Sequence, residues 1–300
     1  MRILLIIWLA ALSVEARAQV LFASHSRYNY VTVEDRGKYR VLSFNGSQES
    51  RVSRFNGLLG HFEYTEYLEM PLIWAPRAKR VLMIGLGGGS TQKAYNHYYP
   101  DIQVETVELD PMVVTAATKF FGVKKSAKLK IHVSDGRVYL KRNKDVKYDV
   151  ILLDAYTSHR KGSFIPFHLA TKEFFELASK NLTANGVLGY NVIGTTDGWR
   201  ADNVGSLHRT LRTVFPNVYH FPARETRNIV FVATKEKAPL TTKSLGAKYA
   251  ALLKARPKLS PHFLKRIQVI RNQVPKTAAR SPVLTDSYTP ASGLLGSRWK

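Results

Sequence analysis

One strand of this chain runs directly into a glycine-rich loop, and this junction constrains the fold more than any other feature. The sequence VLMIGLGGGSTQ at residues 81–92 reads as an apolar strand followed by a loop that opens a helix. Glycine is needed where the backbone turns sharply and approaches a ligand with no Cβ in the way. We therefore expect this loop to contact a ligand through Gly85, Gly87, Gly88, Gly89 and Ser90.

The pattern around this junction predicts an α/β fold. From residue 80 to about residue 232, short apolar runs typical of strands alternate with amphipathic stretches typical of helices. Such alternation indicates a Rossmann-like, doubly wound, mostly parallel sheet with helices on both faces. Because crossovers between parallel strands are right-handed, the carboxyl ends of the strands share one edge, where a ligand would bind.

Three acidic side chains follow successive predicted strands at that edge. Glu108 lies about 20 residues after the glycines, where a carboxylate can bind the two hydroxyls of a ribose. Asp135, followed by Gly136, can accept a hydrogen bond from the amine of adenine, and Asp154 ends the next strand. A buried acid is costly without a partner, so three at one edge favour a shared polar ligand. For Glu108 the alternative is an ordinary carboxylate at a strand end.

The segment before the α/β region has a different pattern. Residues 28–46 alternate in period two around Asp35-Arg36-Gly37, which predicts a small antiparallel β unit with a hairpin. Residues 62–73 then have near-helical spacing, which predicts a linking helix before the next strand.

The segment after the α/β region is strongly basic. Beyond residue 235, the only acidic residues are Glu236 and Asp286. We expect two basic helices, near residues 247–253 and 261–270, followed by a loose tail. A solvated basic face is the simplest interpretation, and contact with a membrane surface or a partner is the alternative.

The first residues match a secretory signal peptide. A charged start precedes an apolar run at residues 3–14 and a small-x-small cleavage site, Ala16-Arg17-Ala18. The apolar run is shorter than the roughly 20 residues that a membrane-spanning helix needs. We therefore predict export to the periplasm or the medium, with a buried first helix or a membrane anchor as alternatives. The chain then divides into four parts. These are the signal peptide (1–18), the N-terminal β unit with its linking helix (19–74), the nucleoside-binding domain (75–235) and the basic C-terminal extension (236–300).

The composition limits both the chemistry and the partners. The 300 residues include no cysteine, which excludes disulfides, thiolate nucleophiles and cysteine-zinc sites. The nine histidines are scattered, and their spacing indicates no metal site. The net charge of +23 attracts anionic surfaces and repels a polycation unless a local acidic pocket reverses the sign. No module for specific nucleic-acid binding is visible.

Several motifs, taken together, resemble one family. Their order and spacing are similar to those of the spermidine synthase group, within the class I S-adenosylmethionine-dependent methyltransferase-like fold. The segment YTEYLEM at residues 64–70 resembles that family's Y-x-E-M segment, and the early hairpin resembles its N-terminal β domain. The four motifs that carry the resemblance are GGG at 87–89, VELDPMVV at 107–114, SDGRVYL at 134–140 and YDVILLDA at 148–155.

This resemblance implies a function and roles for the site residues. The family transfers an aminopropyl group from its co-substrate, decarboxylated S-adenosylmethionine, to a small amine acceptor, putrescine. Glu108 would hold the ribose, Asp135 and Gly136 the adenine, and the glycine loop the thioether side of the nucleoside. Asp154 and Tyr67 would flank the amine. The reaction is a displacement beside a sulfonium, so it needs a neutral amine and a carboxylate to take or steer its proton. A homodimer is one option for the assembly.

The chain departs from the family pattern at three positions. Ser90 stands where the family's glycine loop has an acidic residue that recognises the donor's ammonium. Thr157 stands where the family has the aspartate that acts as general base, and Leu68 replaces a histidine or glutamine. Three other polar side chains could compensate, namely Glu66, Glu69 and His159.

These departures keep other functions open. One is an S-adenosylmethionine-dependent methyltransferase, because Ser90 does not repel the carboxylate of the intact donor as an acidic residue would. Another is a non-catalytic exported protein that docks on anionic surfaces through residues 236–300. Aminopropyl transfer and methyl transfer share one expectation, which is the binding of an adenine nucleoside such as methylthioadenosine.

Overall fold

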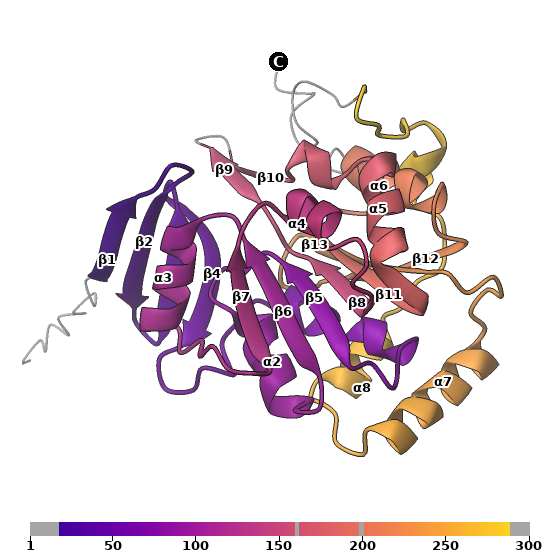
Figure 1. The fold of residues 1–300 in the computed structure, drawn as a ribbon, viewed down its shortest axis with the longest axis horizontal. Coiled ribbons are helices and arrows are strands. Elements are labelled where there is room, and N and C mark those ends of the chain that lie inside the picture. Colours follow the sequence, from indigo (N-terminus) through magenta and orange to yellow (C-terminus); the bar gives the residue numbers. More distant parts are fainter. Residues whose placement is uncertain (1–17, 160–161, 198–200, 289–300) are drawn as a thin grey trace, which may run out of the picture.

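The computed structural model describes residues 18–159, 162–197 and 201–288 (Figure 1). The predicted signal peptide, apart from its last residue, lies outside this part of the chain. Among the described helices, none combines the length and the apolar character needed to cross a bilayer.

A seven-stranded sheet forms the centre of the molecule (Figure 1). The five strands from β11 to β7 are parallel, whereas β13 pairs antiparallel with both β11 and β12. The predicted Rossmann-like, mostly parallel sheet is therefore confirmed, with two antiparallel pairings at one side. In spatial order the strands are β12 (Asn217–Pro222), β13 (Asn228–Thr234), β11 (Leu182–Ile193), β8 (Tyr148–Leu153), β5 (Arg80–Ile84), β6 (Gln103–Glu108) and β7 (Leu129–Val133).

Helices cover both faces of this sheet because its central strands are apolar on both sides. In β5, Val81 and Met83 pack into one core, whereas Leu82 and Ile84 pack into the other. This arrangement is what a buried parallel strand requires, since successive side chains point to opposite faces. The first core includes α2 (Ser90–Tyr98) and α3 (Pro111–Phe120), and the second includes α4 (Gly136–Arg142), α5 (Lys172–Asn181) and α6 (Ala201–Arg212).

A second, antiparallel sheet precedes the central one and packs against α3 (Figure 1). The predicted hairpin is confirmed as the second and third of its strands, which pair from Val31 with Phe44 to Arg36 with Tyr39. Two further strands flank this hairpin and were not predicted. In order, the four are β1 (Gln19–His25), β2 (Tyr30–Arg36), β3 (Tyr39–Phe44) and β4 (Ser47–Ser53).

Short elements connect the larger ones. The predicted linking helix is two separate pieces, α1 (Tyr64–Tyr67) and the 3₁₀ helix η1 (Met70–Ile73), with Pro71 in the first turn of the second. Proline lacks an N–H donor and is tolerated only at a helix start, so the first piece ends before it. Beyond β8 lie a hairpin and a 3₁₀ helix that were not predicted: β9 (Thr157–His159), β10 (Gly162–Phe164) and η2 (Phe167–Leu169).

The C-terminal extension is packed onto the body of the protein. Its two predicted helices are present as α7 (Thr242–Ala255) and α8 (Phe263–Ile267), followed by the 3₁₀ helix η3 (Lys276–Ala279). The expectation of a loose tail is wrong for residues 281–288. Leu284 is fully buried, and Asp286 accepts hydrogen bonds from Arg137 and Thr171. One buried leucine, one paired carboxylate and several hydrogen bonds to the backbone hold this segment, and such isolated contacts leave no periodic signal in a sequence.

Candidate active site

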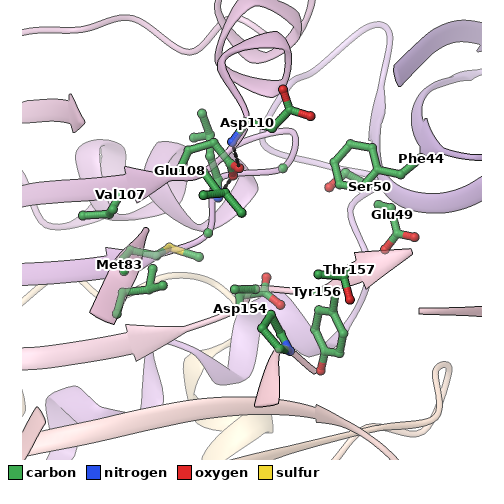
Figure 2. Close-up of a pocket in the computed structure, with 18 of the residues that line it drawn as sticks. Phe44, Glu49, Ser50, Met83, Val107, Glu108, Asp110, Asp154, Tyr156 and Thr157 are labelled. Atoms are coloured by element: carbon green, nitrogen blue, oxygen red, sulfur yellow. Dashed lines mark hydrogen bonds between the residues drawn. The ribbon is translucent and has the colours of Figure 1, made fainter. Parts of the chain in front are cut away.

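A cavity of about 370 Å³ opens where the N-terminal sheet faces the carboxyl ends of the central strands (Figure 2). Cavities that bind small molecules are commonly of this size or larger. Its wall comes from β4, from the loops that follow β5, β6, β7 and β8, and from η2. The cavity therefore lies at the edge where the sequence predicts a ligand.

The start of the glycine loop forms part of the cavity wall. Gly85 has a φ of 104°, and a Cβ at this position would lie 2.1 Å from the carbonyl oxygen of Asp154. The chain after β5 can therefore pass the end of β8 only if residue 85 has no side chain. Gly87 also lines the cavity, as does Ser90 in the first turn of α2.

The other two glycines of the loop do not line the cavity. A Cβ on Gly88 would meet the ring of Phe121, and one on Gly89 would lie 2.3 Å from the Val123 side chain. These two glycines serve close packing behind the loop, so the prediction that they contact a ligand is corrected.

Glu108 lies in the cavity wall and is held by the neighbouring backbone. Its two carboxyl oxygens accept hydrogen bonds from Leu86 N at 3.0 Å and from Asp110 N at 2.9 Å (Figure 2). Burial raises the pKa of Glu108 to about 7, although both hydrogen bonds favour the ionised form. A carboxylate oxygen can accept a further hydrogen bond beyond these.

Asp135 and Gly136 line the cavity at the start of α4. Asp135 caps this helix by accepting a hydrogen bond from Val138 N at 2.9 Å, and its other oxygen lies 2.6 Å from His168 Nε2. The hydrogen bond with His168 is the main cause of the lowered pKa of Asp135. His168, which was not predicted as a site residue, lines the cavity from η2 and is 33 residues away from Asp135 along the chain.

Asp154 follows the last residue of β8 and points into the cavity (Figure 2). One of its oxygens accepts a hydrogen bond from Asn191 Nδ2 at 2.7 Å, and the other accepts one from the Tyr64 hydroxyl at 3.3 Å. Burial raises the pKa of Asp154 to about 6, against these two donors. The carboxylate is therefore oriented from both sides.

Tyr67, which was predicted to flank the amine with Asp154, does not line the cavity. It is fully buried, and its hydroxyl donates a hydrogen bond to Glu63 at 3.2 Å. Its ring packs against Phe221 instead. Tyr64 is the tyrosine of α1 that reaches Asp154, so the prediction named the wrong tyrosine of the segment.

Two of the three side chains that could compensate for the departures from the family pattern, Glu66 and Glu69, lie outside the cavity wall. Thr157 itself lines the cavity. Glu66 forms an ion pair with Arg266 of α8, and Glu69 accepts a hydrogen bond from the Tyr99 hydroxyl at 2.5 Å. Neither glutamate lines the cavity, so neither is placed to compensate. The side chain of His159 lies outside the described part.

The cavity wall is acidic although the chain is basic. Five carboxyl groups line it, against two guanidinium groups, which belong to Arg27 and Arg51. A local excess of this kind is the condition under which a strongly positive protein can bind a cation. In the described part of the chain, no group of three or more histidine or acidic side chains is placed to hold a metal ion. The five carboxyl groups of the wall belong to Glu49, Glu108, Asp110, Asp135 and Asp154.

Comparison with known proteins places the sequence near one family. The model of the spermine/spermidine synthase domain matches residues 61–243. The polyamine aminopropyltransferase of Vibrio vulnificus is 31% identical over 287 residues, which are 92% of this chain and 91% of that protein. The eEF1A lysine and N-terminal methyltransferase of Xenopus laevis is 33% identical over 144 residues, which are 46% of this chain and 20% of that protein.

Solved structures share the fold. A probable spermidine synthase from Corynebacterium glutamicum has a TM-score of 0.68 at 18% identity and covers 90% of this chain and 97% of its own. A spermidine synthase in complex with the transition-state analogue AdoDATO has a TM-score of 0.58 at 20% identity, and the match covers 82% of this chain and 86% of that one. Human methyltransferase-like protein 13 in complex with SAH has a TM-score of 0.56 at 22% identity, and the match covers 67% of this chain and 99% of that one.

Proposed function

Because this chain belongs to the spermine/spermidine synthase family, we propose that it binds decarboxylated S-adenosylmethionine and transfers the aminopropyl group to a small amine. The observation that carries the proposal is the acidic cavity. Five carboxyl groups line it, three of them at the ends of successive strands, in a protein whose net charge is +23. The donor is a sulfonium and the acceptor an amine, so both substrates are cationic and match this wall.

We assign the nucleoside to the end of the cavity formed by the strand ends of β6 and β7. Glu108 would accept hydrogen bonds from the ribose hydroxyls, since its two carboxylate oxygens offer more acceptor positions than the neighbouring backbone N–H groups occupy. Asp135 would accept one from the adenine amine, in competition with or in addition to His168. Gly85 and Gly87 leave room for the thioether side of the nucleoside.

We assign the acceptor to the end of the cavity at Asp154. A pKa of about 6 leaves this carboxylate mostly ionised at neutral pH, so it can orient an amine and steer its proton. Asn191 and Tyr64 hold its two oxygens in place, and such positioning contributes to catalysis because the amine must approach the carbon in line with the leaving sulfur.

Calorimetric titration of residues 19–300 with methylthioadenosine and with the two forms of S-adenosylmethionine tests this proposal. We expect the decarboxylated form to bind more tightly than the intact form, and Glu108→Ala to lose the binding. Formation of methylthioadenosine from the decarboxylated donor in the presence of 1,4-diaminobutane would then establish the transfer. Failure of all three nucleosides to bind would contradict the proposal.

Methyl transfer from intact S-adenosylmethionine is the second candidate. Ser90 contributes no charge to the wall, and Arg51 lies in it, so the carboxylate of the intact donor would meet a cation rather than an acid. Tighter binding of the intact donor, together with release of S-adenosylhomocysteine, would favour this function over aminopropyl transfer.

We also propose that the protein is exported after cleavage behind Ala18. β1 begins at Gln19, so this cleavage would remove no helix or strand of the described fold. N-terminal sequencing of the protein purified from the periplasm or the medium should begin at Gln19, and a start at Met1 would contradict export by this route.

A further inference from the structure

A bulge in β4 brings one additional acidic side chain to the cavity. Leu42 and Ser43 are consecutive on β3, but their partners on β4 are Ser50 and Gln48. Glu49 is therefore the residue that the bulge inserts. A bulge bends its strand and redirects a side chain, and bulges are frequent beside active sites. As a result Glu49 and Ser50, although neighbours in sequence, both line the cavity.

Contacts with the glycine loop hold the bulge in place. Ser50 Oγ accepts a hydrogen bond from Gly88 N at 3.0 Å, and a Cβ at Gly87 would lie 2.7 Å from the same oxygen. A loop with side chains at these positions would keep β4 at a greater distance. The glycines thus permit a close approach of the N-terminal sheet, and this approach sets the position of Glu49.

Glu49 faces the acceptor end of the cavity. Figure 2 shows Glu49 and Asp154 pointing into the cavity from opposite walls. Burial is the main cause of the raised pKa of Asp154, and the charge of Glu49 adds to it. For Tyr64, burial and the charge of Asp154 come first, and Glu49 again adds to the rise in pKa. Glu49 is thus within electrostatic range of both groups at the acceptor end.

We propose that Glu49 takes the place of the carboxylate that is missing at Thr157, and that it binds the acceptor amine opposite Asp154. This inference rests on the aminopropyl transfer proposed above. Two carboxylates that face one cavity repel each other, and a cationic amine between them relieves that repulsion. The acceptor class that fits is a primary amine with a second cationic group, and an amine that carries a carboxylate is disfavoured.

The chemical step balances with Glu49 as the base. Glu49 takes one proton from the bound ammonium, which leaves a neutral amine with a free electron pair. The nitrogen forms a bond to the aminopropyl carbon beside sulfur, and the carbon–sulfur bond breaks with its electron pair passing to sulfur. The products are a secondary ammonium and the neutral thioether methylthioadenosine. Glu49 then gives its proton to water, while Asp154 orients the nitrogen throughout.

The test compares Glu49→Gln with the wild-type chain, residues 19–300. We expect kcat/KM for 1,4-diaminobutane to fall about 100-fold, which is in the range found when a general base is removed. The Kd for methylthioadenosine should stay within about threefold of the wild-type value, because the nucleoside end is unchanged. Glu34→Gln is the matched control: Glu34 lies on β2 of the same sheet, pairs with Arg36 at 2.8 Å and does not line the cavity.

A second-site variant separates the proposed role from a general loss of structure. In the Glu49→Gln background, Thr157→Asp returns a carboxylate to the acceptor end and should recover at least tenfold in kcat/KM, which is part of the general-base contribution. Thr157→Asn, of equal size and without charge, should recover nothing. Equal activity of the aspartate and asparagine variants would overturn the inference, as would a Glu49→Gln protein within about threefold of wild type.

Binding of 1,4-diaminobutane to the methylthioadenosine complex, measured by calorimetry, distinguishes this inference from the proposed function. Loss of diamine affinity in Glu49→Gln without turnover by the wild-type protein would support amine binding by Glu49, but would contradict aminopropyl transfer and with it the role of Glu49 as base. Turnover that is the same in the wild type and in Glu49→Gln would support aminopropyl transfer and contradict the role of Glu49. If the wild type neither binds the diamine nor turns it over, both are wrong.

Discussion

Glu108 should lower the stability of the ligand-free protein at neutral pH. Its carboxyl lies in the cavity wall, and burial raises its pKa from 4.5 to about 7. A carboxyl whose pKa is higher in the folded than in the unfolded chain adds stability below the unfolded value, and this stability is lost as the pH rises through the folded value. The loss should therefore begin above pH 4.5 and be complete a little above pH 7.

The size of this effect follows from the two pKa values. Because a change of one in pKa corresponds to about 1.4 kcal/mol, the rise from 4.5 to about 7 costs about 3 kcal/mol once Glu108 is fully ionised. Solvent in the cavity screens part of this cost, and a small part already applies at pH 5. We therefore expect the free energy of unfolding to lose about 2 kcal/mol between pH 5 and pH 8 through this group.

Urea unfolding of the wild type and of Glu108→Gln at several pH values tests this expectation. The side chain of residue 108 is neutral at every pH in the variant. The free energy of unfolding of the variant minus that of the wild type should therefore increase by about 2 kcal/mol from pH 5 to pH 8. Glu69 and Asp154 also have raised pKa values, but they titrate in both proteins and cancel in the difference. Parallel pH curves for the two proteins would refute the reasoning.

Nucleoside binding should reverse the effect on the pKa of Glu108. Ribose hydroxyls that donate to the carboxylate favour its ionised form, so binding at pH 6.5 should release part of a proton. Calorimetry of methylthioadenosine binding in buffers of different ionisation enthalpy would detect this proton at pH 6.5, and should detect none from this group at pH 9, where Glu108 is already ionised.

Five further variants test other parts of the structure. Gly85→Ala should cost more than about 3 kcal/mol in urea unfolding, because its Cβ would meet the Asp154 carbonyl at a φ of 104°. Arg266→Met should lower the free energy of unfolding by about 3 to 5 kcal/mol by leaving buried glutamates without their cation, whereas the exposed neighbour Lys265→Met should change it little. Tyr64→Phe should lower kcat/KM about tenfold with stability retained, and Tyr67→Phe should cost about 1 kcal/mol in stability with kcat/KM retained.

Those parts of the site that the sequence predicts correctly depend on backbone position alone. A residue at the carboxyl end of a parallel strand must lie at the common edge, whatever surrounds it. Glu108, Asp135 and Asp154 therefore reach the cavity as expected. The sheet is predictable for the same reason, because alternating apolar runs determine which segments become strands.

Other parts of the site depend on local geometry that a sequence pattern does not contain. α1 is a single turn, and no periodicity distinguishes the face of Tyr64 from that of Tyr67. Glu49 reaches the cavity through a bulge, which shifts the register of β4 by one residue and has no compositional signal. His168 meets Asp135 from a three-residue helix that is too short to predict.

The net charge of the chain and the charge of its cavity act over different distances, so they do not conflict. Surface charges are screened beyond about 8 Å at physiological ionic strength. A carboxylate in the cavity wall acts on a ligand at contact distance, where screening is weak. The excess of basic side chains therefore governs the approach of a cation from solution, while Glu49 and Asp154 govern its binding. A basic protein with such a cavity can retain a cationic ligand that its outer surface does not attract.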